Sequence, residues 1–109
     1  LGNKFAAGMK PGPRTTKIST FKSADPRNFN QELDHDAITT FIRHQEDTLE
    51  LLEMARKVDM TRTKTGISIT SMIRLRLGDT FRVVVYHNWR HIDQARRALA
   101  ATTAVQGAN

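Results

Sequence analysis

The residues in this 109-residue sequence that are best suited to chemistry are arginines in the C-terminal half, together with one tyrosine. A guanidinium group binds phosphate or carboxylate through paired N–H groups, and an aromatic ring beside it can stack on a base or sugar. We therefore expect an anion-binding surface for nucleic-acid phosphates. A solvated basic face and pairing with carboxylates of a partner protein are the alternatives. The residues assigned to this surface are Arg74, Arg76, Arg82, Tyr86, Arg90, Arg97, Arg62 and Lys64.

Alternation of polar and apolar residues over positions 66–89 predicts a β-hairpin that carries the centre of this surface. A three-residue loop at residues 78–80 keeps one face of the hairpin apolar. That register places Arg76 directly opposite Arg82 on the outward face. Like charges in facing positions destabilise a strand pair, so the arrangement favours an anion between them.

Two histidines, His87 and His91, are the other candidates for chemistry. A spacing of four brings two imidazoles together only on a continuous helix, where they can share a metal ion. The predicted hairpin puts His87 at the end of a strand and His91 in the first turn of the next helix. We therefore predict no catalytic residue, no metal and no cofactor. A small histidine-dependent metal protein or enzyme is retained as the third hypothesis.

Helices are predicted on both sides of the hairpin. Over residues 34–58 the apolar residues recur at steps of three, four and seven, which is typical of one long amphipathic helix. After Trp89 a narrower apolar stripe predicts a C-terminal helix that ends near Gly107. The predicted fold class is therefore α+β: a long amphipathic helix, an antiparallel β-hairpin and a C-terminal helix, preceded by an extended basic N-terminal arm.

Residues 1–33 form the predicted arm, and residues 34–109 form a small helix–hairpin–helix domain. All three prolines lie in the arm, and proline disfavours helix at its own position and at the preceding one. A disordered tail is the alternative to an arm that becomes ordered on neighbouring proteins. The partner-binding residues assigned to the arm are Phe5, Lys10, Arg14, Lys17, Ile18, Phe21 and Phe29.

Charge is sorted along the chain into three blocks of alternating sign. Counting Lys and Arg against Asp and Glu, residues 1–31 carry +5, residues 32–60 carry −5 and residues 61–109 carry +6. A basic arm and a basic C-terminal half favour contact with an anionic surface. The acidic block is mostly one face of the predicted long helix, either solvated or paired with the arm.

Composition excludes several classes of protein. The chain has no cysteine, which excludes a disulfide scaffold and a thiolate zinc site. Its longest apolar run, residues 83–86, is far shorter than the roughly 20 residues of a membrane span, so we predict no span. A domain this small has little stability to spare, and we expect support from a protein partner, nucleic acid or self-association.

The sequence therefore favours a non-enzymatic, small basic subunit of a large macromolecular assembly, such as a ribonucleoprotein or a virus-like particle. Its arm would lie on neighbouring protein subunits, and its arginine-rich hairpin on the backbone of RNA or DNA. The alternative is a purely protein-bound accessory subunit, as in a respiratory complex or a capsid. We expect an intracellular location. Because the chain begins at Leu1, a mitochondrion after removal of a leader and a viral particle are both left open.

Overall fold

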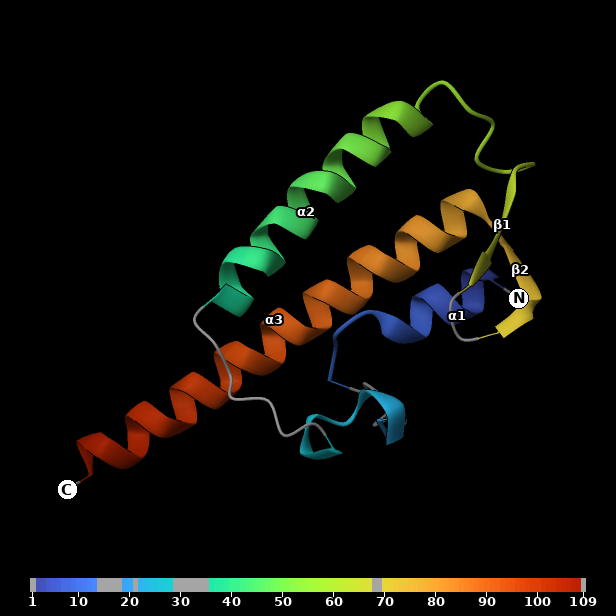
Figure 1. Cartoon of the computed structure of the whole chain (residues 1–109). Coiled ribbons are helices and arrows are strands. Elements are labelled where there is room, and N and C mark those ends of the chain that lie inside the picture. Colours follow the sequence, from blue (N-terminus) through green and yellow to red (C-terminus); the bar gives the residue numbers. More distant parts are fainter. Residues whose placement is uncertain (1, 14–18, 21, 29–35, 68–69, 109) are drawn as a thin grey trace. The chain divides into compact units, whose positions relative to one another are not determined.

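The computed structural model describes residues 2–13, 19–20, 22–28, 36–67 and 70–108 (Figure 1). In this part of the chain, helices accompany one two-stranded antiparallel sheet, which confirms the predicted α+β class. The elements are α1 (Gly2–Met9), two short 3₁₀ turns (Lys22–Ala24 and Pro26–Asn28), α2 (Asp36–Ala55), β1 (Lys64–Ile67), β2 (Thr70–Arg76) and α3 (Leu77–Gly107).

The chain forms two compact units, one made of Leu1–Thr16 with Met60–Asn109 and the other of Lys17–Asp59. The first unit contains α1, the hairpin and α3, and the second contains α2 and the 3₁₀ turns. The predicted boundary between the arm and the domain, at residues 33 and 34, lies outside the described residues.

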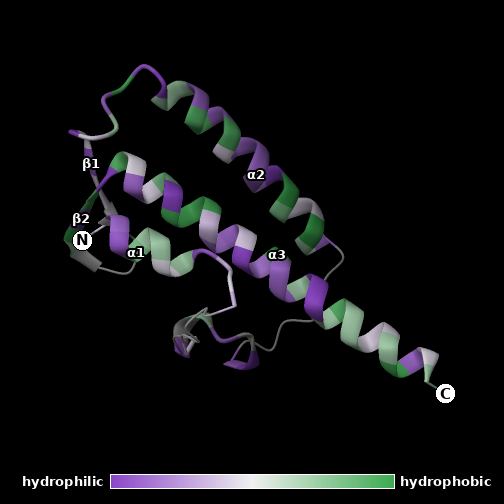
Figure 2. Ribbon diagram, turned by 180° about the vertical axis from the view of Figure 1, so that it is seen from behind, coloured by the Kyte–Doolittle hydropathy of each residue, from purple (hydrophilic) through white to green (hydrophobic). Residues whose placement is uncertain are grey.

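The second unit is dominated by α2, which lies within the helix predicted over residues 34–58. Asp36 is in its first turn, where a negative charge interacts favourably with the helix dipole. Figure 2 shows apolar residues recurring along α2 between polar ones. These apolar side chains are exposed, with Ile38 at 68% and Leu49 at 64%. An isolated amphipathic helix of this length is only marginally stable in water, so α2 requires a packing surface.

The first unit is built on α3, a helix of 31 residues. The prediction of a second strand at residues 81–89 is therefore wrong. Phe81, Val83 and Val85 lie on alternate positions, as in a strand, but Phe81, Val85 and Ile92 also recur at steps of four and seven, as in a helix, so the apolar residues of this segment fit both periods. Local interactions favour the helix: Asp79 in the first turn pairs with Arg82, and the hydroxyl of Thr80 donates to the Arg76 carbonyl at 3.2 Å.

The hairpin is antiparallel as predicted, but its strands are β1 and β2. The strand β1 consists of Lys64 and Thr65, which precede the predicted hairpin, and of Gly66 and Ile67 from its start, and the rest of the first predicted strand supplies β2. Lys64 is opposite Arg76, and the register shifts after Gly66. Leu75 is 5% exposed, so β2 is held to the unit by its apolar face. The backbone N–H of Leu77 donates to the carbonyl of Thr63 at 2.8 Å, which joins the start of α3 to the residue before β1.

The N-terminal residues are helical rather than extended as far as Met9, which corrects the predicted arm. In α1, Ala6 is 1% exposed and Gly2 is buried. A Cβ atom on Gly2 would lie 2.5 Å from Oδ2 of Asp79, so the lack of a side chain lets α1 approach the first turn of α3. Pro11 and Pro13 both follow Met9, so they explain why α1 ends there. They do not disfavour helix in residues 2–9, which the prediction of an extended arm overlooked.

Few apolar side chains are buried: among the described residues they are Ala6, Ala55 and Leu75. No helix in the described ranges combines the length and apolar character that a membrane crossing requires.

Candidate anion-binding site

The centre of the candidate site is a pair of facing cations on the hairpin. Lys64 on β1 and Arg76 on β2 are Cα partners in the antiparallel register, and both side chains are exposed. The ion pairs formed among the described residues include neither of them. Two like charges in directly facing positions destabilise a hairpin, and an anion bound between them removes that cost. The predicted pairing of Arg76 with Arg82 across the hairpin is wrong, because Arg82 lies on α3 and Lys64 is opposite Arg76.

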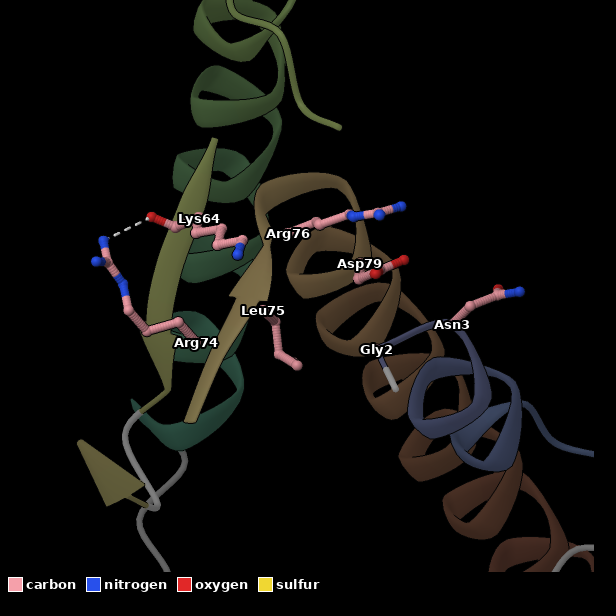
Figure 3. Close-up of a pocket in the computed structure, with 7 residues that line it drawn as sticks. All are labelled: Gly2, Asn3, Lys64, Arg74, Leu75, Arg76 and Asp79. Atoms are coloured by element: carbon pink, nitrogen blue, oxygen red, sulfur yellow. Dashed lines mark hydrogen bonds between the residues drawn. The ribbon is translucent and has the colours of Figure 1, made fainter. Parts of the chain in front are cut away.

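Arg74 adds a third cation from the same strand. Its Nη2 atom donates to the backbone carbonyl of Lys64 at 3.2 Å, so the side chain crosses over β1 (Figure 3). A guanidinium group carries five N–H donors, and this contact uses one of them. Arg74 is exposed, and Figure 3 shows it extending in a different direction from Arg76. The hairpin therefore presents cations on two sides.

These residues border a shallow hollow of about 250 Å³ within the first unit. Its lining comes from the hairpin, the start of α1 and the first turn of α3 (Figure 3). Asp79 is its acidic member, and this carboxylate is paired with Arg82. The hollow therefore has an excess of positive charge, which suits an anion. The residues that line it are Gly2, Asn3, Lys64, Arg74, Leu75, Arg76 and Asp79.

Arg82 has a different position from the one predicted. It lies on α3, where its Nη2 atom donates to Asp79 and its Nη1 atom donates to Oδ1 of Asn3 at 2.9 Å. The side chain of Asp79 is only 12% exposed, whereas that of Arg82 is 48% exposed. The hydrogen bond from Arg82 to Asn3 connects α3 to α1, and both Asn3 and Asp79 line the hollow.

Two further predicted residues lie along α3, away from the hairpin. Arg90 is buried, and its Nη1 atom reaches the Gly8 carbonyl of α1 at 3.5 Å. Arg97 forms an ion pair with Asp93 at 2.8 Å, one turn earlier on the same helix. The structure therefore does not bring Arg90 and Arg97 to the facing cations.

Tyr86 and Lys10 contact each other rather than the hairpin. The Nζ atom of Lys10 lies 6.0 Å from the centre of the Tyr86 ring and 5.9 Å from that of Trp89. The two rings are 6.4 Å apart and tilted by 51°. A cation held near two aromatic faces is stabilised by their quadrupoles, so Lys10 fastens the end of α1 to α3.

The other predicted residues are scattered. Arg62 lies in the turn before β1, and Phe5 is on α1 with 39% of its surface exposed. The remaining residues assigned to the arm, Arg14, Lys17, Ile18, Phe21 and Phe29, lie outside the described residues.

The structure also brings His87 and His91 together, which the sequence interpretation did not expect. Both lie on α3, their Nε2 atoms are 2.9 Å apart, and their rings meet edge to face. Partial burial, followed by the nearby His91 and Arg90, lowers the pKa of His87 below its usual 6.5. The spacing of four indicates that the two rings meet on a helix, but the wrongly predicted strand at residues 81–89 placed His87 outside that helix. No cluster of three or more metal-binding side chains occurs in the part of the chain that the structure describes.

Comparison with known protein families, characterised proteins and solved structures finds no significant match to this chain.

Proposed function

We propose that this protein is a non-enzymatic, small basic subunit of a larger assembly, and that its hairpin binds the phosphate backbone of RNA or DNA. The observation that supports this proposal is the pairing of Lys64 with Arg76 across the hairpin. Arg74 adds a forked donor that extends from the other side of the hairpin. Without a ligand these cations repel one another, and they border a hollow with excess positive charge. A ligand with several closely spaced anionic oxygens would suit such a site.

A purely protein-bound subunit is the second candidate, and the apolar surface favours it. Large apolar side chains are exposed on both long helices, including Leu49 at 64% and Leu99 at 69%. Trp89 exposes nearly half of its surface. Exposed apolar stripes of this kind are typical of surfaces that pack against other chains. In this candidate the hairpin cations would pair with carboxylates of a neighbouring subunit.

The deciding experiment measures binding of the whole chain to a single-stranded RNA oligonucleotide and to duplex DNA over a series of salt concentrations. For each, the slope of log K against log salt reports the number of phosphates neutralised, at about 0.7 per contact for single strands and about 0.9 for B-DNA. We expect the slope measured for K64Q/R74Q/R76Q to correspond to about two to three fewer phosphate contacts than the slope of the parent protein.

The matched control is R43Q/K57Q/R96Q, which removes the same charge from exposed positions on or next to the two long helices. We expect this variant to keep nearly the whole slope. If both triple variants lose binding equally, the attraction depends on net charge and the hairpin is not the site. If the parent protein does not bind either nucleic acid at low salt, the protein-bound candidate is favoured.

A further inference from the structure

We propose that His87 and His91 form a binding site for a divalent transition metal ion on α3, with both Nε2 atoms as ligands. This site is separate from the hairpin cations, and it stands whether or not the chain binds nucleic acid.

The distance between the two nitrogens fits chelation. Imidazole nitrogens bind such ions at about 2.0–2.1 Å, and two of them at the right angle of square-planar Cu²⁺ or Ni²⁺ are about 2.9 Å apart. The Nε2 atoms of His87 and His91 are 2.9 Å apart in the structure. Residues four apart on an α-helix lie on the same face in successive turns, so the helix itself holds this spacing.

Gln94 orients one of the two rings. Oε1 of Gln94 lies 3.1 Å from Nδ1 of His91. An amide oxygen only accepts hydrogen bonds, so Nδ1 of His91 carries the proton and Nε2 keeps its lone pair. Outer-shell contacts of this kind fix the tautomer and the direction of metal-binding histidines.

Metal binding requires a change of tautomer in the second ring and a rotation of the rings that turns both lone pairs toward the ion. With Nε2 of His91 as an acceptor, Nε2 of His87 donates the hydrogen bond between the two rings. A metal ion would replace that hydrogen bond, with the proton of His87 moving to Nδ1. Both rings stay neutral, and the remaining coordination positions are left to water or to a second molecule.

The chemistry of the ligands indicates which ions would bind. Imidazole suits copper, nickel and zinc, whereas magnesium and calcium prefer oxygen ligands. Affinity for nitrogen sites rises from nickel to copper and falls again at zinc. We therefore expect Cu²⁺ to bind most tightly, Ni²⁺ and Zn²⁺ more weakly, and Mg²⁺ not at all.

The test is calorimetric titration of the untagged whole chain with CuCl₂, NiCl₂, ZnCl₂ and MgCl₂. We expect one tight Cu²⁺ site per chain, and a loss of at least tenfold in affinity in H87A and in H91A. His91 is exposed and His87 is only partly buried on the helix, and alanine is the best helix former, so circular dichroism should show that both variants stay folded. H44A removes an exposed histidine of α2 and should bind Cu²⁺ like the parent protein.

A second readout locates the metal directly. Substoichiometric Cu²⁺ should broaden the NMR signals of the His87 and His91 rings first, and Zn²⁺ should shift them. The proposal is overturned if the parent protein shows no Cu²⁺ binding at millimolar concentration, or if H87A and H91A bind as tightly as the parent. It is also overturned if H44A alone loses the site.

Discussion

Lys64 lies directly opposite Arg76 across the β1–β2 hairpin, and no acidic side chain forms an ion pair with either of them among the described residues. The hairpin is therefore less stable than it would be with an acidic residue at one of these two positions, and a bound anion would stabilise it. This relationship connects stability to binding, since a substitution that removes the repulsion should also remove the site.

The first prediction concerns that repulsion. K64E should stabilise the chain by about 0.2–1 kcal/mol relative to the parent, because it replaces a like-charge pair by an opposite one, and K64Q should lie between them. Urea unfolding followed by circular dichroism measures the differences. The gain should disappear in K64E/R76E, where two like charges face each other again. Equal stability of all four proteins would show that the pair does not interact.

The second prediction concerns the close approach of α1 to α3. G2A should destabilise the first unit by about 1–3 kcal/mol, because its Cβ atom would overlap the side chain of Asp79. The matched control is G8A in the same helix, where the added Cβ would meet no atom within 4 Å beyond its chain neighbours and the backbone of its own helix. G8A should be stabilising by about 0.5–1 kcal/mol, since alanine favours helix over glycine. Thermal unfolding of both variants checks the difference in sign.

The third prediction concerns Arg90. R90M should cost about 1–3 kcal/mol, because it leaves the Gly8 carbonyl without its charged donor and places a thioether in a site built for a guanidinium group. R96M, at an exposed position on the same helix, should change the free energy of unfolding by less than about 0.5 kcal/mol. Comparable effects of the two substitutions would show that Arg90 does not hold α1 in place.

The fourth prediction concerns pH. The pKa of His87 should be below 6.5 in the folded protein, chiefly because of its partial burial and then because of His91 and Arg90. The unfolded chain then binds more protons than the folded one just below pH 6.5, so stability should fall as the pH is lowered through that value. NMR titration of the ring protons gives the pKa, and urea unfolding between pH 5 and 7.5 gives the stability.

The variant H91A tests the cause of that shift. Removal of the neighbouring imidazole should raise the pKa of His87 toward 6.5, and H87Q should remove the corresponding part of the pH dependence. An unchanged pKa in H91A would assign the whole effect to burial and Arg90.

Some elements depend on local pattern alone, and those were predictable. The apolar period of α2 extends over five turns with Asp36 at its start, and no competing period fits the same residues. The strand β2 follows the alternation around Leu75. The concentration of cations around Arg74 and Arg76 was predictable for the same reason, because their positions follow from the strand itself.

The sequence by itself therefore determined the α+β class, the helix α2, the strand β2 and the basic character of the hairpin. Only the tertiary structure decided residues 77–89, where Phe81 and Val85 fit a strand and a helix equally well. Contacts distant in the sequence resolve that ambiguity: Asn3 with Arg82, Gly8 with Arg90, and Lys10 with the rings of Tyr86 and Trp89. These contacts hold α1 on a continuous α3, and that helix places Lys64 rather than Arg82 opposite Arg76 and His87 beside His91.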